Sequence, residues 1–327
     1  MNKLSLLLVL SSLFSSAAHA QMAFWSASED EFESAPCKAQ GAPALAEIED
    51  YFADLKGKKL TIIYNGVSLV DENKILFKAY KDLTASKDLE TRFAIGSSCQ
   101  NVICAVEKIW GEELGKKLLY MRVKFGFNGS EYAFGDTSRF ELNELDQVLE
   151  TLTEIPDSLH PLGRGGNQRL VPAAKGSFYG YKKVEGDVSA DAEIKLYDVW
   201  RNSRSDYQRQ YALFHEFGHN VARVKGHTYV PLDFKPLHQV AGCEVSKYGQ
   251  TNTAEDFAET FTAYRFNGSV LKANCPLKFE YMKKHFYAEV EYTDEVACNK
   301  APVVKAKKKF NLRDIFDLKQ ITSRSSL

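Results

Sequence analysis

The chain has 327 residues, of which 44% are hydrophobic and 26% are charged, and its formal net charge is -1. This composition is typical of a globular protein with one large domain or two smaller ones. The balanced charge lacks the excess of basic residues that nucleic-acid-binding proteins carry, so we expect no nucleic-acid partner.

The first 20 residues have the organisation of a secretory signal peptide. A basic tip precedes an apolar run, and the segment ends in Ala18-His19-Ala20. We expect cleavage after Ala20. The run is too short to span a membrane, and Gln21 rather than cysteine follows it, so a lipoprotein anchor is not expected. No later segment is long and apolar enough to span a bilayer, which predicts a soluble mature protein that is secreted or periplasmic.

An even number of cysteines fits such an oxidising compartment. The six are Cys37, Cys99, Cys104, Cys243, Cys275 and Cys298. Six cysteines allow 15 pairings, so the pairing is open. Cys99 and Cys104 are close enough to close a small loop, Cys275 and Cys298 flank an aromatic-rich helix, and Cys37–Cys243 would follow only by elimination. The sequence contains no C-x-x-C pair, so a zinc cluster of cysteines is not favoured.

Several elements are predicted before residue 190. Residues 44–57 read as a helix, because apolar residues recur at steps of three and four, and residues 143–156 read as a helix stopped by Pro156. Residues 58–65 and 74–80 read as strands. Residues 104–130 read as a short helix, then a strand, then a turn. Residues 158–176 are expected to form a loop, and their "GRGGN" lacks the strand–helix context and the lysine of a phosphate loop, so no nucleotide cofactor is expected.

The chain divides by composition into five parts. We expect a signal peptide at 1–20, an irregular or short pro-segment at 21–44, an α/β N-terminal region at 45–190, a catalytic region at 191–300, and a basic tail at 301–327. The overall class is predicted to be α+β. Residues 192–200 read as a strand that could present an edge to an extended peptide. Neither the oligomeric state nor the role of residues 45–190 follows from the sequence.

The strongest helix signal, residues 203–226, carries the sequence "HEFGH". His215 and His219 are four residues apart and project from one side of the helix, so both imidazoles can bind one metal ion. Glu216 is placed to take a proton from a water molecule activated by that ion. The alternative is a solvated helix face that happens to carry these three residues.

A catalytic zinc site needs a third protein ligand and an open position. The H-x-x-G-x-x-H extension is excluded, because Ala222 and Lys225 occupy its last two places. His227 and His238 remain as possible ligands in the loop that follows. The other possibility is a glutamate from a second helix, which points to "YGQTNTAEDFAETF" at residues 248–261.

The acids of this second helix have an ordinary alternative explanation. Asn252 is expected to be the N-cap, which makes Glu255 the acid of a capping box. Glu255 and Glu259, however, share one face of the helix. If that face meets the two histidines, Glu255 can reach the metal, and Glu259 can accept a proton from the non-ligating nitrogen of a histidine. Asp256 is expected to point toward solvent or the cap.

Together, "HEFGH" and "SKYGQTNTAEDFAETF" resemble the zinc peptidase family that includes the anthrax lethal factor catalytic domain, a gluzincin-type family with a zincin-like fold. The resemblance covers roughly residues 194–266, about a fifth of the chain. By position, it implies one Zn²⁺ ion held by His215, His219 and Glu255, with Glu216 as the general base. It also implies that the Tyr248 hydroxyl stabilises the oxyanion and that Glu259 has a supporting role.

These residues predict an exported zinc endopeptidase that hydrolyses a polypeptide substrate. Three alternatives stay open: a zincin-like binding module without activity, a zinc hydrolase of cell-wall peptides, and a structural zinc site. The structural site fits poorly, because two histidines and one glutamate leave a coordination position open. The substrate, the cleavage specificity and the removal of a propeptide do not follow from the sequence.

Overall fold

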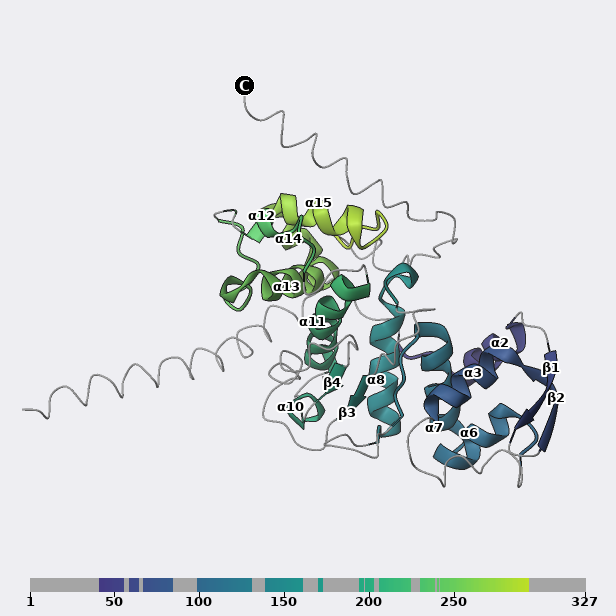
Figure 1. Ribbon diagram of the computed structural model, residues 1–327. Coiled ribbons are helices and arrows are strands. Elements are labelled where there is room, and N and C mark those ends of the chain that lie inside the picture. Colours follow the sequence, from purple (N-terminus) through teal and green to yellow (C-terminus); the bar gives the residue numbers. More distant parts are fainter. Residues whose placement is uncertain are drawn as a thin grey trace, which may run out of the picture.

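The computed structural model describes residues 41–55, 59–64, 67–84, 99–130, 139–160, 170–172, 194–196, 198–202, 206–224, 230–238, 240 and 242–293. These residues are mostly helical, and they include two small two-stranded sheets (Figure 1). This content of helices and strands is compatible with the predicted α+β class. No helix in these ranges has the length and apolarity needed to cross a membrane. The predicted signal peptide and basic tail lie outside the described residues.

The N-terminal elements form a helical group with one hairpin, at the opposite end of the molecule from α13 in Figure 1. In chain order they are α2 (Leu45–Asp54), β1 (Lys59–Tyr64), β2 (Val67–Asn73), α3 (Lys74–Leu83), α6 (Val102–Trp110), α7 (Glu112–Tyr120) and the π-helical turn η1 (Met121–Phe125). The strands are antiparallel, with Lys59 opposite Asn73 and Tyr64 opposite Val67. The predictions of a helix near residue 45 and of a strand at 58–65 are therefore confirmed.

The predicted strand at 74–80 is wrong, because these residues form helix α3. The Asn73 side chain caps the helix by accepting hydrogen bonds from the backbone N–H groups of Ile75 and Leu76, at 2.8 and 3.3 Å. Leu76 and Tyr80 are buried one turn apart. A short apolar run satisfies both the strand and the helix pattern, and here the cap decides for the helix.

The predicted strand within residues 104–130 is also wrong. Helices α6 and α7 follow each other directly, separated by Gly111, whose φ of 92° suits glycine. They cross closely at Gly115, where a Cβ atom would lie 2.3 Å from the Val106 carbonyl oxygen. Apolar residues around position 118 are therefore buried because α7 packs against α6, and not because they belong to a sheet.

The middle of the chain contributes one long helix and a short parallel sheet. Helix α8 (Leu142–Thr153) confirms the helix predicted for 143–156, and the 3-10 turn η2 (Asp157–Leu159) follows it. Strands β3 (Leu170–Pro172) and β4 (Ile194–Leu196) pair in parallel. β3 lies inside the segment expected to be a loop. The strand predicted at 192–200 is confirmed only for β4, since Asp198–Arg201 form helix α10.

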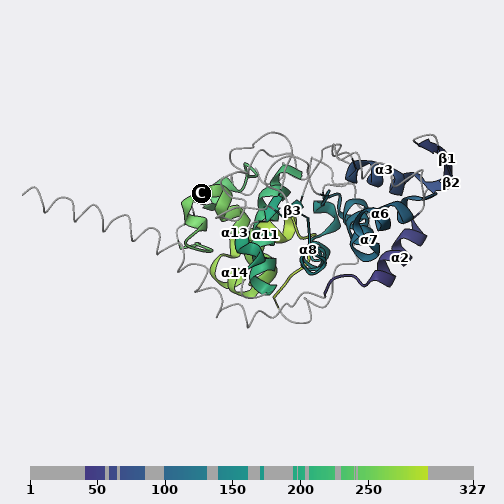
Figure 2. The same ribbon diagram turned by 90° about the horizontal axis from the view of Figure 1, so that it is seen from below.

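The C-terminal helices surround the residues that the sequence selects as candidates. They are α11 (Asp206–Val224), α12 (Lys235–His238), the 3-10 turn η3 (Gly249–Thr251), α13 (Thr253–Phe266), α14 (Gly268–Asn274) and α15 (Pro276–His285). Helix α11 packs against both α13 and α8. Figures 1 and 2 show α11 between these two helices in perpendicular views.

A buried ion pair fixes the end of α13 to the end of α8. The Arg265 guanidinium is fully buried and donates from Nη2 to Glu154 Oε2 at 2.6 Å and from Nε to the same atom at 3.1 Å. Its Cζ atom lies 4.8 Å from the centre of the Tyr292 ring. Removing one partner of such a pair leaves a buried charge uncompensated, so the pair strongly restricts the placement of α13.

Two disulfides join described residues. The predicted Cys99–Cys104 pair is confirmed. Cys243, however, is bonded to Cys275, with Cα atoms 4.9 Å apart. The expected Cys275–Cys298 and Cys37–Cys243 pairs are therefore wrong, because each would use a cysteine already bonded elsewhere. Spacing along the chain could not reveal a contact between the segment before α13 and the start of α15. Both bonds fit an oxidising compartment.

Candidate metal centre

Helix α11 carries the "HEFGH" sequence on a buried helix rather than on a solvated face. Leu213, Phe214 and Phe217 are fully buried, and His215 and Glu216 are only 4% and 6% exposed. The interpretation as a solvated helix face is thus wrong. Polar side chains with so little exposure need partners within the protein.

Helices α11 and α13 approach each other closely at Gly218 and Ala258. A Cβ atom at Gly218 would lie 2.9 Å from the Ala258 Cα atom, closer than such contacts occur in proteins. Gly218 lies between His215 and His219, and Ala258 lies between Glu255 and Glu259. The absence of a side chain at position 218 therefore lets both histidines contact Glu255 and lets His215 also contact Glu259.

The start of α13 leaves the Glu255 carboxylate available for other contacts. The Asn252 side-chain oxygen accepts hydrogen bonds from the backbone N–H groups of Ala254 and Glu255, at 3.0 and 3.1 Å. Asn252 is thus the N-cap, as the sequence predicts. The Glu255 carboxylate instead lies against the histidines of α11, so the capping-box explanation for this acid does not hold.

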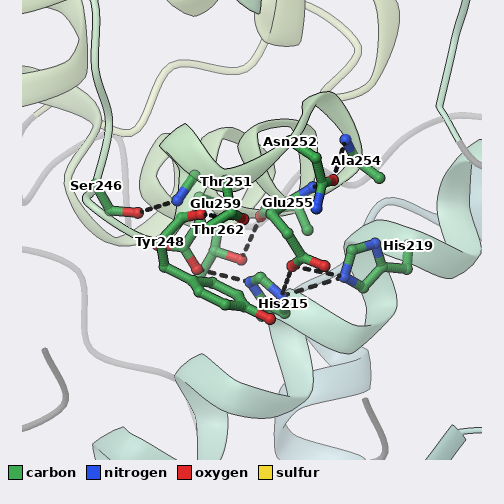
Figure 3. A network of polar contacts seen from close by, with 12 residues as sticks. His215, His219, Ser246, Tyr248, Thr251, Asn252, Ala254, Glu255, Glu259 and Thr262 are labelled. Carbon is green, nitrogen blue, oxygen red and sulfur yellow. Dashed lines mark hydrogen bonds and ion pairs between the residues drawn. The ribbon is translucent and has the colours of Figure 1, made fainter. Parts of the chain in front are cut away.

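Three ligand atoms converge between the two helices (Figure 3). Glu255 Oε2 lies 3.1 Å from His215 Nε2 and 3.2 Å from His219 Nε2, and the two Nε2 atoms are 3.2 Å apart. Each residue directs one potential ligand atom to the same point, so this group can hold a metal ion. The three atoms form a nearly equilateral triangle.

Glu259 holds the far side of the His215 ring. Its Oε1 atom lies 2.7 Å from His215 Nδ1, and its Oε2 atom accepts a hydrogen bond from the Tyr211 hydroxyl at 3.0 Å. Glu259 has no exposed surface. The contact between Tyr211 and Glu259 was not predicted from the sequence. A buried tyrosine one turn before a metal-ligand histidine is a usable signal, because its hydroxyl needs a partner.

This arrangement sets the protonation of the His215 ring. A carboxylate can only accept hydrogen bonds, so the nitrogen facing Glu259 carries the hydrogen. In the neutral ring, His215 Nε2 then presents a lone pair to the Glu255 carboxylate. Lone pairs converging on one point favour a cation between them.

The electrostatics of the group also favour positive charge at its centre. Burial by itself lowers the pKa of His215, but the contacts with Glu255 and Glu259 outweigh it and raise that pKa to about 10. Burial by itself raises the pKa of Glu255, but His215 and His219 hold that pKa well below its usual value. A proton and a metal ion therefore compete for the same position.

Glu216 and Tyr248 lie next to this triangle. Burial raises the pKa of Glu216 above its usual value, although His219 and His215 oppose the shift. The Tyr248 ring is half-buried, and its centre lies 5.7 Å from the centre of the His215 ring. Figure 3 shows the Tyr248 side chain extending alongside His215 from the segment before α13. All six site residues named from the sequence thus gather at the α11–α13 contact.

The other candidate ligands do not join this group. His238 Nδ1 lies 3.0 Å from Asp256 Oδ2, in a separate contact on another face of α13. His227 lies outside the described residues. The expectation that Asp256 points toward solvent or the cap is wrong, since Asp256 is 2% exposed and its carboxylate pairs with Lys278. Helix α15 covers this face, which periodicity within α13 could not reveal.

No family model, curated protein or solved structure matches this chain. The metal centre is therefore interpreted from its own geometry and from the resemblance carried by its two motifs.

Proposed function

We propose that this protein is an exported zinc-dependent endopeptidase. The observation that carries the proposal is the triangle of His215 Nε2, His219 Nε2 and Glu255 Oε2, with edges of 3.1–3.2 Å. Zinc binds nitrogen and oxygen at about 2.0–2.1 Å in a tetrahedron, and the edges of such a tetrahedron are about 3.3 Å long. The triangle thus has the size of one face of a zinc coordination shell.

The chemistry of the ligands supports zinc over calcium and magnesium. Calcium and magnesium prefer shells of oxygen atoms, whereas two imidazoles and one carboxylate suit zinc. Three protein ligands leave one position of the tetrahedron open, as in catalytic rather than structural sites. When bound there, zinc supplies Lewis-acid activation of water and of a substrate carbonyl group.

The protein's own residues account for the proton transfers of peptide hydrolysis. Glu216 accepts a proton from the attacking water as the new carbon–oxygen bond forms, and delivers it to the amine as the carbon–nitrogen bond breaks. The Tyr248 hydroxyl donates a hydrogen bond to the oxyanion that develops on the carbonyl oxygen. Glu259 and Tyr211 hold the His215 ring in the tautomer that the site needs.

Removal of the Tyr248 hydroxyl is expected to slow turnover without loss of metal. In the Tyr248→Phe variant, kcat should fall roughly 10²- to 10³-fold, the usual effect of losing one oxyanion donor. Zinc content and thermal stability should stay near the wild-type values. Tyr51→Phe, in α2, is the matched control. Steady-state kinetics with metal analysis will check this, and an unchanged kcat would remove Tyr248 from the chemistry.

Substrate digestion with and without chelator tests the function itself. We expect the purified protein to cleave casein, to stop when the metal is removed, and to recover when zinc is restored. Cleavage of isolated cell wall but not casein would instead support a hydrolase of cell-wall peptides. Zinc bound without hydrolysis of either substrate would identify a binding module. Casein cleavage that persists in the metal-free protein would overturn the proposal.

A further inference from the structure

A second buried charged group lies beside the metal centre, on another face of α13. The Lys278 side chain comes from α15 and is 1% exposed. Its ammonium donates to both carboxylate oxygens of Asp256, each at 2.7 Å, and to the Cys243 carbonyl oxygen at 2.8 Å. An ammonium group has three hydrogens to donate, so these contacts satisfy it fully.

These contacts connect the metal centre to the segment that carries Tyr248. Asp256 directly follows Glu255, whose carboxylate belongs to the metal-binding triangle. Cys243 begins the segment 243–252, which carries Tyr248 and ends at the Asn252 cap of α13. Lys278 therefore joins the start of this segment to the first turn of the helix that holds Glu255.

Local hydrogen bonds also hold the remainder of the segment. The Tyr248 carbonyl oxygen accepts hydrogen bonds from the Thr251 hydroxyl at 2.7 Å and from the Thr251 N–H at 3.0 Å. Gly249 donates from its N–H to the Ser246 hydroxyl oxygen at 2.9 Å. A Cβ atom at Gly249 would lie 3.3 Å from the Asp256 Cα atom, so the segment runs directly over the residue that Lys278 binds.

The disulfide and the ammonium hold different parts of Cys243. The bond to Cys275 fixes the Cys243 side chain, and Cys275 is three residues before Lys278 on the chain. The ammonium holds the Cys243 carbonyl oxygen, and with it the peptide plane from which the segment continues toward Tyr248. The Cys243 N–H donates to the Val240 carbonyl oxygen at 3.2 Å, whereas the contact with Lys278 is on the carbonyl group that leads on toward Tyr248.

We propose that Lys278 is a positioning residue for Tyr248: it fixes the segment 243–252 to the first turn of α13 and thereby sets the Tyr248 hydroxyl relative to the metal centre. The effect on catalysis rests on the proposed peptidase function, whereas the effect on the segment does not. Misplacement of a catalytic group by about 1 Å can slow a reaction about 10²-fold, so the expected effect is measurable.

Amide hydrogen exchange on the metal-free protein tests the positioning without any assay of activity. In the Lys278→Met variant, we expect faster exchange in residues 243–252 and unchanged exchange in α11. Lys283→Met is the matched control, because Lys283 lies on the same helix and pairs with Glu291 instead. Unchanged exchange in 243–252 in a folded Lys278→Met variant would overturn the proposal.

A double variant covers the case in which Lys278→Met does not fold. Replacing Asp256 by Asn together with Lys278 by Met removes both charges, so no unpaired buried charge remains. We expect the same local increase in exchange in this double variant. Exchange at the wild-type rate in 243–252 of this folded protein would equally contradict the role of Lys278.

A kinetic cycle with Tyr248→Phe tests the effect on turnover. Lys278→Met should lower kcat roughly 10- to 100-fold with little change in KM, and should have almost no further effect when Tyr248 is already Phe. Equal fold losses in both backgrounds would show that Lys278 does not act through Tyr248. If the wild type hydrolyses no substrate, the proposed function fails, and the exchange experiment still decides the positioning.

Discussion

The Glu216→Gln variant is expected to keep its metal ion and to lose peptidase activity. Glutamine has nearly the shape of glutamate but cannot accept the proton of the attacking water. General acid–base catalysis typically contributes 10²–10⁴-fold, so kcat should fall by about that factor. The burial of Glu216 also means that a neutral amide is tolerated there more easily than a charge.

Zinc analysis and casein digestion on the same preparation check this expectation. Glu280→Gln, an exposed residue on α15, is the control for the chemical change alone. Full activity in the Glu216→Gln variant would show that the proposed mechanism is wrong. Loss of zinc along with activity would instead assign Glu216 to metal binding.

Replacement of Glu255 by alanine is expected to abolish stable metal binding. Only two imidazoles remain after this change, and the negatively charged ligand is lost. The helix itself should persist, because Asn252 rather than the Glu255 carboxylate caps α13. The effect should exceed that of Glu259→Gln, since loss of an outer partner of a histidine ligand typically weakens metal binding about 10- to 100-fold.

The relative zinc affinities of the Glu255→Ala and Glu259→Gln variants distinguish the roles of the two residues. Competitive zinc titration should give wild type the tightest binding, Glu259→Gln an intermediate affinity and Glu255→Ala the weakest. Zinc retained undiminished by Glu255→Ala would remove this residue from the ligand set. Equal losses in both variants would contradict the difference in role that their contacts with His215 indicate.

The helices of the metal centre were predictable because their signals are local. The spacing of His215 and His219 on a periodic helix requires only residues within one turn, and the cap at Asn252 requires only its next three neighbours. The role of Glu255 could not be predicted from local pattern alone, because a capping box and a metal site both require an acid at this position. The resemblance supplied that choice, and the geometry agrees with it.

Much of the remaining fold depended on contacts between residues far apart in the chain. Residues 74–80 satisfy both strand and helix patterns, and there the Asn73 cap and the burial of Leu76 and Tyr80 together favour the helix. The burial of Asp256 depends on Lys278, 22 positions further along the chain. The pairing of Cys243 with Cys275 likewise depends on how α15 folds back over the segment before α13.

Under the proposed function, the close approach of Gly218 and Ala258 would also link the stability of the protein to the supply of metal. His215 and Glu255 are 40 residues apart, so the triangle exists only while α11 and α13 are docked. A metal ion that binds only the docked helices adds about 2.7 kcal/mol of stability at 100 times its dissociation constant. Scarcity of the proposed metal would then let the helices separate more often, and the chain would become easier to cleave by a protease.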